Sequence, residues 1–338
     1  MVSIRPYRLN RVASMLLTAM LLALLSSEGW AESIRTAIPQ ANLNYLSIYV
    51  AEARGFFRDE GLENETVVIS GPLATAALLS GDIDFSGGGG SGMRAALKGA
   101  PLKGIYFQTE KVTFYLIADP SIKTAADLKG KKVAVGSSGD TQDRMITMFA
   151  ERGGVSARDI IRIAMGSDTN TRILAIKSGA AHASTVDPGG LVFAQKEGLI
   201  SLGFLGDLFP MPFQGFVTLD KKIRENSGQV KRWLKAAIRG LMFVRDRPEE
   251  AVDLGIKKLQ LGKATRPMII EGTKNYARAL PQGIPGMPTS EGIKNFIEYD
   301  IKIPLQIKED IPPERLLYLQ FVEEVKSELE AAQRRPSR

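Results

Sequence analysis

The chain of 338 residues contains no cysteine and a single histidine, His182. Without cysteine it has no disulfide framework, thiolate metal site, cysteine nucleophile or iron–sulfur cluster. One histidine cannot build a histidine metal cage, and Ser-His-Asp chemistry would have to pass through that single imidazole. These absences argue against most metalloenzyme and hydrolase mechanisms, and we expect no metal and no cofactor.

Long apolar runs are also scarce, and the longest lies at the N-terminus. Val12–Leu25 comprises 14 residues and follows three arginines. A membrane-spanning helix needs about 20 apolar residues, whereas the hydrophobic region of a signal peptide needs about 7–15. We therefore predict a signal peptide over 1–31, cleaved after Ala31. The alternative is a buried N-terminal helix.

The chain has a basic excess, with 44 Lys and Arg against 37 Asp and Glu and a net charge of +7. Without residues 1–31 the chain has 41 basic and 36 acidic residues and a net charge of +5. This charge is scattered and does not alternate with aromatic residues, so we expect no nucleic-acid partner. With no second long apolar segment, the mature protein is expected to be soluble in an extracytoplasmic space.

Hydrophobic residues make up 44% of the chain, which is enough for packed cores, and the length predicts about two domains at roughly 150 residues each. Strand-like segments such as Ile34–Ile38 and Lys132–Val135 alternate with helical patterns such as Gln142–Arg152. This alternation predicts α/β units with largely parallel sheets. From Val230 the pattern is mainly helical, with a final helix expected over Leu316–Leu329.

The order of these segments predicts two α/β lobes built by a chain that crosses between them twice. Lobe 1 would comprise 32–115 and 216–338, with the C-terminal helices, and lobe 2 would comprise 116–215. Two crossings make a hinge. Ligands of open α/β sheets bind at the carboxyl ends of the strands, so we expect a binding cleft between the lobes.

Each predicted lobe contains a strand, then a small polar loop, then a helix. The two segments are FSGGGGSGM (85–93) and VAVGSSGDTQ (133–142). Glycine lets the backbone approach a ligand, and the first N–H groups of a helix attract carboxylate, sulfonate or phosphate oxygens. Neither loop matches the phosphate-loop or dinucleotide motif, which argues against nucleotide binding. The glycine run alone is equally typical of a flexible turn.

Several motifs resemble one protein family when they are taken in order. AEARGFFRDEGL (51–62) and SGDIDF (80–85) resemble motifs of the periplasmic solute-binding proteins of ABC importers in the sulfonate/nitrate/taurine/thiamine-precursor (NMT1/THI5-like) group. The resemblance covers almost the whole predicted mature chain. It implies the type II periplasmic binding protein fold and a monomer that captures a small, anionic organic solute without covalent chemistry. It also implies delivery of the solute to an ABC permease in the inner membrane.

The sequence departs from the family pattern in two ways. The family usually has Gly-x-x-Asp-Ala where this chain has Ala181-His182-Ala183, so a carboxylate common at that place is absent. The thiamine-precursor enzymes of the same fold depend on a cysteine-rich motif, which this chain lacks. The alternatives to import are an enzyme on the same fold and a module that signals ligand occupancy to a receptor.

The family places ligand contacts in the loops that face the cleft, and the matching positions supply hydrogen-bonding groups, backbone N–H groups and aromatic walls. The candidates are Asn42, Asn44, Tyr45, Gly90, Ser91, Gly92, Thr113, Phe114, Ser137, Ser138, Thr141, Asp187, Gln214 and Phe216.

Several of these residues have a simpler structural interpretation. One of the two asparagines is expected to cap the following helix, and packing of the hinge is the alternative role for the two phenylalanines. Asp187 fits a turn before a proline equally well. We expect His182 to be structural at the start of a strand. Arg94, Arg144 and Arg172 could pair with an anion, but arginines on helix faces are mostly solvated.

Overall fold

The computed structural model describes residues 31–136, 138, 141–166, 168–259 and 264–334. Residues 33–338 form one compact unit, and all the elements described below belong to it, apart from the first residue of β1. The predicted signal peptide, 1–31, lies outside the described residues except for Ala31.

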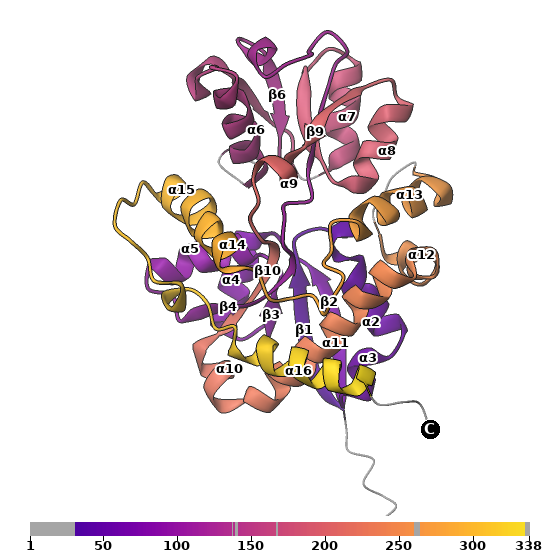
Figure 1. Cartoon of the computed structure of the whole chain (residues 1–338), viewed down its shortest axis with the longest axis vertical. Coiled ribbons are helices and arrows are strands. Elements are labelled where there is room, and N and C mark those ends of the chain that lie inside the picture. The colour runs from indigo at the N-terminus through magenta and orange to yellow at the C-terminus, as the bar shows by residue number, and fades with distance from the viewer. Residues whose placement is uncertain (1–30, 137, 139–140, 167, 260–263, 335–338) are drawn as a thin grey trace, which may run out of the picture. The chain divides into compact units, whose positions relative to one another are not determined.

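The first sheet has five strands in the order β2-β1-β3-β10-β4 (Figure 1). β1 and β3 are parallel, whereas β10 is antiparallel to both β3 and β4. Because β10 comes from much later in the chain than its neighbours, the C-terminal half returns to complete this sheet. The strands are β1 (Glu32–Ile38), β2 (Leu62–Val68), β3 (Phe85–Ser86), β4 (Leu102–Thr109) and β10 (Phe213–Leu219).

The second sheet also has five strands, in the order β7-β6-β8-β5-β9. β6 is parallel to β7 and β8, whereas β5 is antiparallel to β8 and β9. The strands are β5 (Tyr115–Ala118), β6 (Lys132–Val135), β7 (Ile161–Ala164), β8 (Ala183–Val186) and β9 (Ile200–Phe204). The prediction of largely parallel sheets is confirmed, because β1, β3 and β4 run in one direction in the first sheet and β6, β7, β8 and β9 do so in the second. The exceptions are β5 and β10, which follow the two crossings and enter their sheets in the reverse direction.

Helices connect the strands of both sheets and cover them. Figure 1 shows α6 on one side of the second sheet and α7 and α8 on the other. The helices before β10 are α2 (Leu46–Ala53), α3 (Phe56–Asp59), α4 (Gly71–Ser80), α5 (Gly89–Leu97), α6 (Thr141–Arg152), α7 (Thr169–Lys177), α8 (Pro188–Lys196) and α9 (Leu205–Leu208). Those after it are α10 (Asp220–Glu225), α11 (Ser227–Asp246), α12 (Pro248–Gly255), α13 (Arg266–Ala277), α14 (Ser290–Phe296), α15 (Ile303–Leu305) and α16 (Gln320–Arg334).

The last helix begins at Gln320, four residues later than the hydrophobic spacing indicates. The preceding segment runs beside β4 instead. Gly104 donates its N–H to the carbonyl oxygen of Leu316 at 2.8 Å, and Tyr318 donates to the carbonyl of Gly104 at 2.8 Å. Leu316 and Leu317 are buried by this pairing, so their apolar character reflects contact with the sheet and not a helix face.

The first sheet is packed through Trp233 of α11. Its ring stacks on Phe85 with centroids 4.3 Å apart, and its Nε1 donates to the hydroxyl of Thr36 at 2.9 Å. Trp233 is fully buried, so its single polar group needs the partner that Thr36 of β1 provides. This contact ties a post-hinge helix to the first strand and fixes the sheet on which the candidate site is built.

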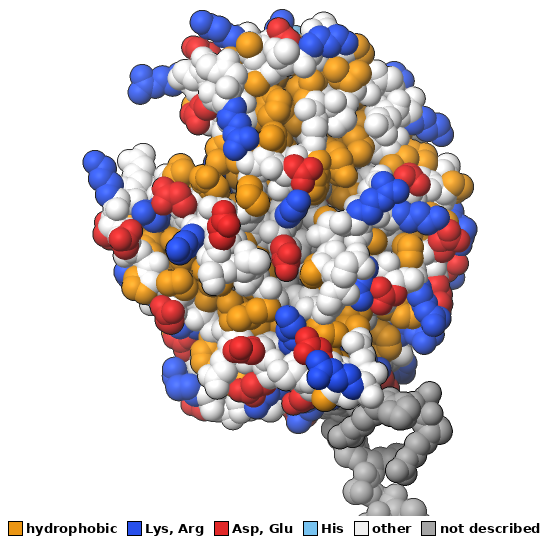
Figure 2. Space-filling model, in the orientation of Figure 1, with side chains coloured by type: hydrophobic (Ala, Val, Ile, Leu, Met, Phe, Trp, Pro, Cys, Tyr) orange, Lys and Arg blue, Asp and Glu red, His pale blue; other side chains and the backbone are white. Residues whose placement is uncertain are grey.

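The surface shows no concentration of one charge on the face in view. Figure 2 shows Lys and Arg side chains intermingled with Asp and Glu over this face. Within the described part of the chain, no helix combines the length and the apolar character needed to cross a membrane.

Candidate functional site

A cavity of about 420 Å³ is lined by both glycine- and serine-rich loops that the sequence singles out. Residues from β1–α2, from the start of α5, from the start of α6 and from β10 all contribute to its wall. This volume is within the range of sites for small organic ligands. The predicted contact residues on the wall are Tyr45, Gly90, Ser91, Ser138, Thr141 and Gln214.

The glycine run at the start of α5 is explained largely by close packing. A Cβ on Gly89 would lie 2.4 Å from the carbonyl oxygen of Gly215, and one on Gly87 would lie 2.8 Å from the ring of Tyr45. Tyr45 donates its hydroxyl to the carbonyl oxygen of Gly87 at 3.0 Å. The run is therefore ordered into a wall of the cavity, with β10 and Tyr45 pressed directly against its backbone.

Two helix N-termini border this cavity. α5 begins within the glycine run at Gly89, and α6 begins at Thr141, and both residues line the wall. The first N–H groups of a helix carry partial positive charge and bind anions. Arg94 of α5 adds a guanidinium to the same wall. The wall is therefore suited to the negatively charged group of a ligand.

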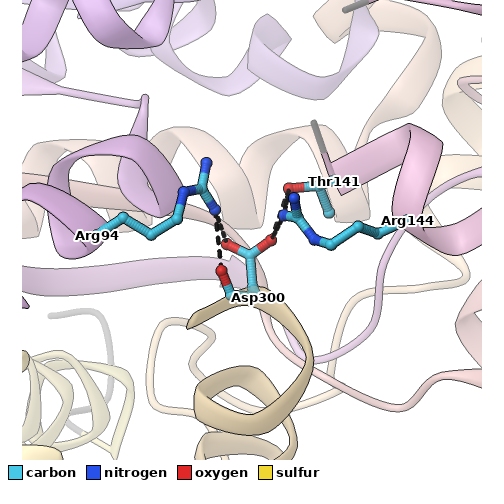
Figure 3. A network of polar contacts seen from close by, with 4 residues as sticks. All are labelled: Arg94, Thr141, Arg144 and Asp300. Carbon is cyan, nitrogen blue, oxygen red and sulfur yellow. Dashed lines mark hydrogen bonds and ion pairs between the residues drawn. The ribbon is translucent and has the colours of Figure 1, made fainter. Parts of the chain in front are cut away.

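The carboxylate of Asp300, on the cavity wall, joins Arg94 to Arg144 (Figure 3). Arg94 donates to Asp300 Oδ2 at 2.9 Å and to the Asp300 carbonyl oxygen at 3.0 Å. Thr141 donates its hydroxyl to Asp300 Oδ1 at 2.7 Å, and Arg144 donates to the same oxygen. Asp300 lies in a π-helical turn, Ile297–Lys302, between α14 and α15. The network connects helices that follow strands of different sheets.

A second cavity of about 630 Å³ shares Pro39 and Gln40 with the first. Its wall includes Asn42 and Asp187, two of the predicted contact residues. Asp187 accepts a hydrogen bond from Gly190 N–H at 2.7 Å and caps α8. Burial raises the pKa of the Asp187 carboxyl above its usual range. Asp187 therefore has the cap role expected of a residue before proline and also lies on a cavity wall.

Asn42 likewise lines the second cavity and caps a helical turn. Its Oδ1 accepts the N–H of Asn44 at 3.1 Å, which caps the short 3₁₀ turn Leu43–Tyr45, and its Nδ2 donates to Gln40 Oε1 at 2.8 Å. These bonds fix the loop after β1, which separates the two cavities.

A buried network of polar side chains lies at the two crossings between the sheets. Thr113 donates its hydroxyl to Asn44 Oδ1 at 3.0 Å and accepts from Gln214 Nε2 at 3.1 Å. Gln214 Oε1 accepts from Tyr276 at 2.8 Å and from Gln108 at 3.3 Å. Thr113 precedes β5 and Gln214 is in β10, so the network holds the segment that leads to the second sheet against the strand at which the chain returns to the first.

Several predicted contacts lie outside both cavity walls. Asn44 and Thr113 belong to the buried network, and Gly92 packs against Val217, which a Cβ would approach to 2.6 Å. Phe114 contacts Phe213 with ring centroids 4.8 Å apart, and Phe216 packs between Tyr45, Tyr106 and Trp233. Ser137 lies outside the described residues. Ligand contacts at all these positions remain a prediction.

Asp300 is not among the predicted site residues, because no local motif marks it and its partner Arg94 lies 206 residues away in the chain. Arg172 is buried and donates to the carbonyl oxygen of Gly166 at 2.7 Å and to Ser184 at 3.2 Å. His182 precedes β8 and accepts the Lys132 N–H at 3.3 Å. Within the described ranges, no group of three or more His, Asp or Glu side chains is placed to hold a metal ion.

The chain is similar to known proteins along most of its length. A family model described as NMT1/THI5 like matches residues 42–251. A protein of Brucella abortus (strain 2308), named as a binding protein, is 27% identical over 219 residues, which cover 64% of this chain and 68% of that protein.

Two solved structures illustrate the range of proteins that share the fold. The periplasmic aliphatic sulphonate binding protein SsuA of Escherichia coli matches with a TM-score of 0.65 and 19% identity, over 85% of this chain and 92% of that chain. The desulfurization enzyme DSZB matches with a TM-score of 0.63 and 14% identity, over 88% of this chain and 99% of that chain. The chain has the fold of the periplasmic binding proteins and belongs to the NMT1/THI5-like family.

Proposed function

We propose that this protein is the periplasmic substrate-binding component of an ABC importer, and that its ligand is a small organic molecule with an anionic group. The observation that carries the proposal is the 420 Å³ cavity, whose wall combines the N-terminal turns of α5 and α6 with Arg94. Family membership and the sulphonate-binding protein of the same fold support it.

The anionic group would lie against Gly90, Ser91 and Ser138, and the rest of the molecule against Tyr45 and Phe213. The second cavity, with Asn42 and Asp187, would take a longer ligand's remaining polar groups. Binding would bring the predicted lobes, 32–115 with 216–338 and 116–215, together about the buried Thr113–Gln214 contact. The permease would then recognise the liganded form.

We propose binding without turnover, although an enzyme shares the fold. Among the described residues that line the 420 Å³ cavity, the single carboxylate is Asp300, and two arginines hold it. General acid–base chemistry needs a group that can exchange a proton with the substrate. A carboxylate held by two guanidinium groups is poorly suited to that task, whereas hydroxyl and backbone N–H groups are suited to reversible binding.

A ligand screen by thermal shift tests the proposal. Purified protein is scanned with alkane- and arylsulfonates, carboxylates, nitrate and pyrimidines, and at least one organic anion should raise the melting temperature. Ser70, the residue before α4, lies at the cavity wall, and Leu79 is exposed on α4 outside both cavities. Ser70→Trp should abolish the shift and Leu79→Trp should retain it. No shift with any compound would contradict the proposal.

Export is tested separately. Expression of the full chain in a Gram-negative host should place the protein in the periplasm with a mass that corresponds to a start at Glu32. A protein that keeps residues 1–31 and stays in the cytoplasm would contradict the predicted signal peptide.

A further inference from the structure

Asp300 lies on the wall of the cavity and yet is part of the packed interior. Asp300 is only 2% exposed, and its carboxylate accepts hydrogen bonds from Arg94, Thr141 and Arg144. It also lies beyond residue 251, where the match to the family model ends. Its role is therefore not assigned by the family resemblance.

The carboxylate cannot swing away when a ligand enters. Arg94 holds both its Oδ2 and its backbone carbonyl oxygen, while Thr141 and Arg144 hold Oδ1 (Figure 3). Gly90 faces it so closely that a Cβ there would lie 2.4 Å from Oδ2. A buried carboxylate that lost these partners would pay a large desolvation penalty, so it stays in place.

We propose that Asp300 is a specificity-determining residue that makes the cavity prefer singly charged over doubly charged anions. This inference rests on the proposed function, because it concerns the anionic group of the same ligand. The fixed negative charge of Asp300 offsets part of the positive charge that Arg94 and the two helix N-termini direct at the cavity. Its repulsion of a ligand grows in proportion to the ligand's charge, so a dianion is penalised about twice as much as a monoanion.

The arginines that hold Asp300 come from two helices, each of which follows a strand of a different sheet. Arg94 is on α5, which follows β3 of the first sheet, and Arg144 is on α6, which follows β6 of the second. The π-helical turn supplies Asp300 from a third element, and such turns are frequent at functional sites. The negative charge of Asp300 therefore lies beside the cavity at the point where α5 and α6 are joined.

The test compares nitrate and sulfate, a monoanion and a dianion at neutral pH, by isothermal titration against the wild-type protein and Asp300→Asn. The substitution keeps the shape and removes one negative charge. We expect nitrate affinity to rise about tenfold and sulfate affinity about a hundredfold, since the electrostatic gain doubles with the ligand's charge. An equal gain for both ions, or no gain for sulfate, would overturn the proposal.

A charge-restoring variant separates the loss of charge from any structural effect of Asp300→Asn. Arg94→Gln combined with Asp300→Asn has the same net charge as the wild type, and it should restore the wild-type preference between nitrate and sulfate. A double variant that keeps an enhanced sulfate preference would contradict the charge argument. The two proposals fail on different results. The proposed function fails if no organic anion binds the wild type, whereas the role of Asp300 is judged from the gain in sulfate affinity in Asp300→Asn, which does not depend on the natural ligand.

Discussion

The side-chain amide of Gln214 donates a 3.1 Å hydrogen bond to the hydroxyl of Thr113, and so joins the start of β10, where the chain has returned to the first sheet, to the segment that leads out to the second. Both residues are buried, and Gln214 also accepts from Tyr276 and Gln108. Gln214 has a φ of 55°, in the left-handed region that favours glycine. The chain thus places a large amide where the backbone alone would favour glycine, which indicates that the side-chain contacts outweigh the strain.

Gln214→Ala should destabilise the protein by about 2–4 kcal/mol, because Thr113 and Tyr276 lose a buried partner. Gln214→Gly loses the same contacts but removes the Cβ from the left-handed backbone, so it should be less destabilising than alanine by about 1 kcal/mol. Urea unfolding of both variants checks the order. If alanine is the more stable of the two, the strain at this position has been overestimated.

Gly90→Ala should destabilise the protein by about 1–3 kcal/mol, because the new methyl group would displace the Asp300 carboxylate from its arginine partners. Gly228 is the matched control. It lies exposed in the first turn of α11 with nothing within 4 Å of a Cβ, so Gly228→Ala should stabilise by up to about 1 kcal/mol. Equal effects of the two substitutions, measured by thermal unfolding, would show that Asp300 does not need the space.

Asp187→Asn should gain stability relative to the wild type as the pH rises. Burial raises the pKa of the Asp187 carboxyl, so its contribution to stability is complete below the unfolded-state pKa and is lost as the pH rises through the folded-state pKa. Asparagine never ionises and is as good a helix cap as aspartate. The difference in unfolding free energy between variant and wild type should therefore grow from pH 3.5 to pH 7.

Asp187→Ala provides the control for this prediction, because it removes the charge and also the cap to Gly190. Asp187→Ala should show the same pH trend as Asp187→Asn, with an unfolding free energy lower than that of Asp187→Asn by about 1 kcal/mol at every pH. If the two variants and the wild type respond to pH in parallel, Asp187 does not titrate differently in the folded state.

Much of the site follows from local sequence, because its loops are defined by neighbouring residues. The segments 85–93 and 133–142 each place a helix N-terminus after a strand, and both border the 420 Å³ cavity. Ser91, Ser138 and Thr141 line the cavity for the same local reason. Such signals depend on residues a few positions apart, which a single sequence displays.

The rest depends on contacts between distant segments. Nothing near Asp300 indicates that it meets Arg94, and the polarity of Asn44 and Gln214 is used in a buried network instead of at an exposed loop. The antiparallel entry of β5 and β10 is likewise decided by the partner strands. Side-chain direction and strand orientation of this kind are set by tertiary packing.

A ligand site between the two loops is tested most directly by isothermal titration of the wild-type protein, Ser70→Trp and Leu79→Trp with the organic anion that gives the largest thermal shift. We expect stoichiometric binding to the wild type and to Leu79→Trp, and at least roughly a hundredfold loss of affinity in Ser70→Trp, whose new side chain would occupy the cavity. Binding that is unchanged in Ser70→Trp, or absent from the wild type for every anion, would contradict a ligand site between the two loops.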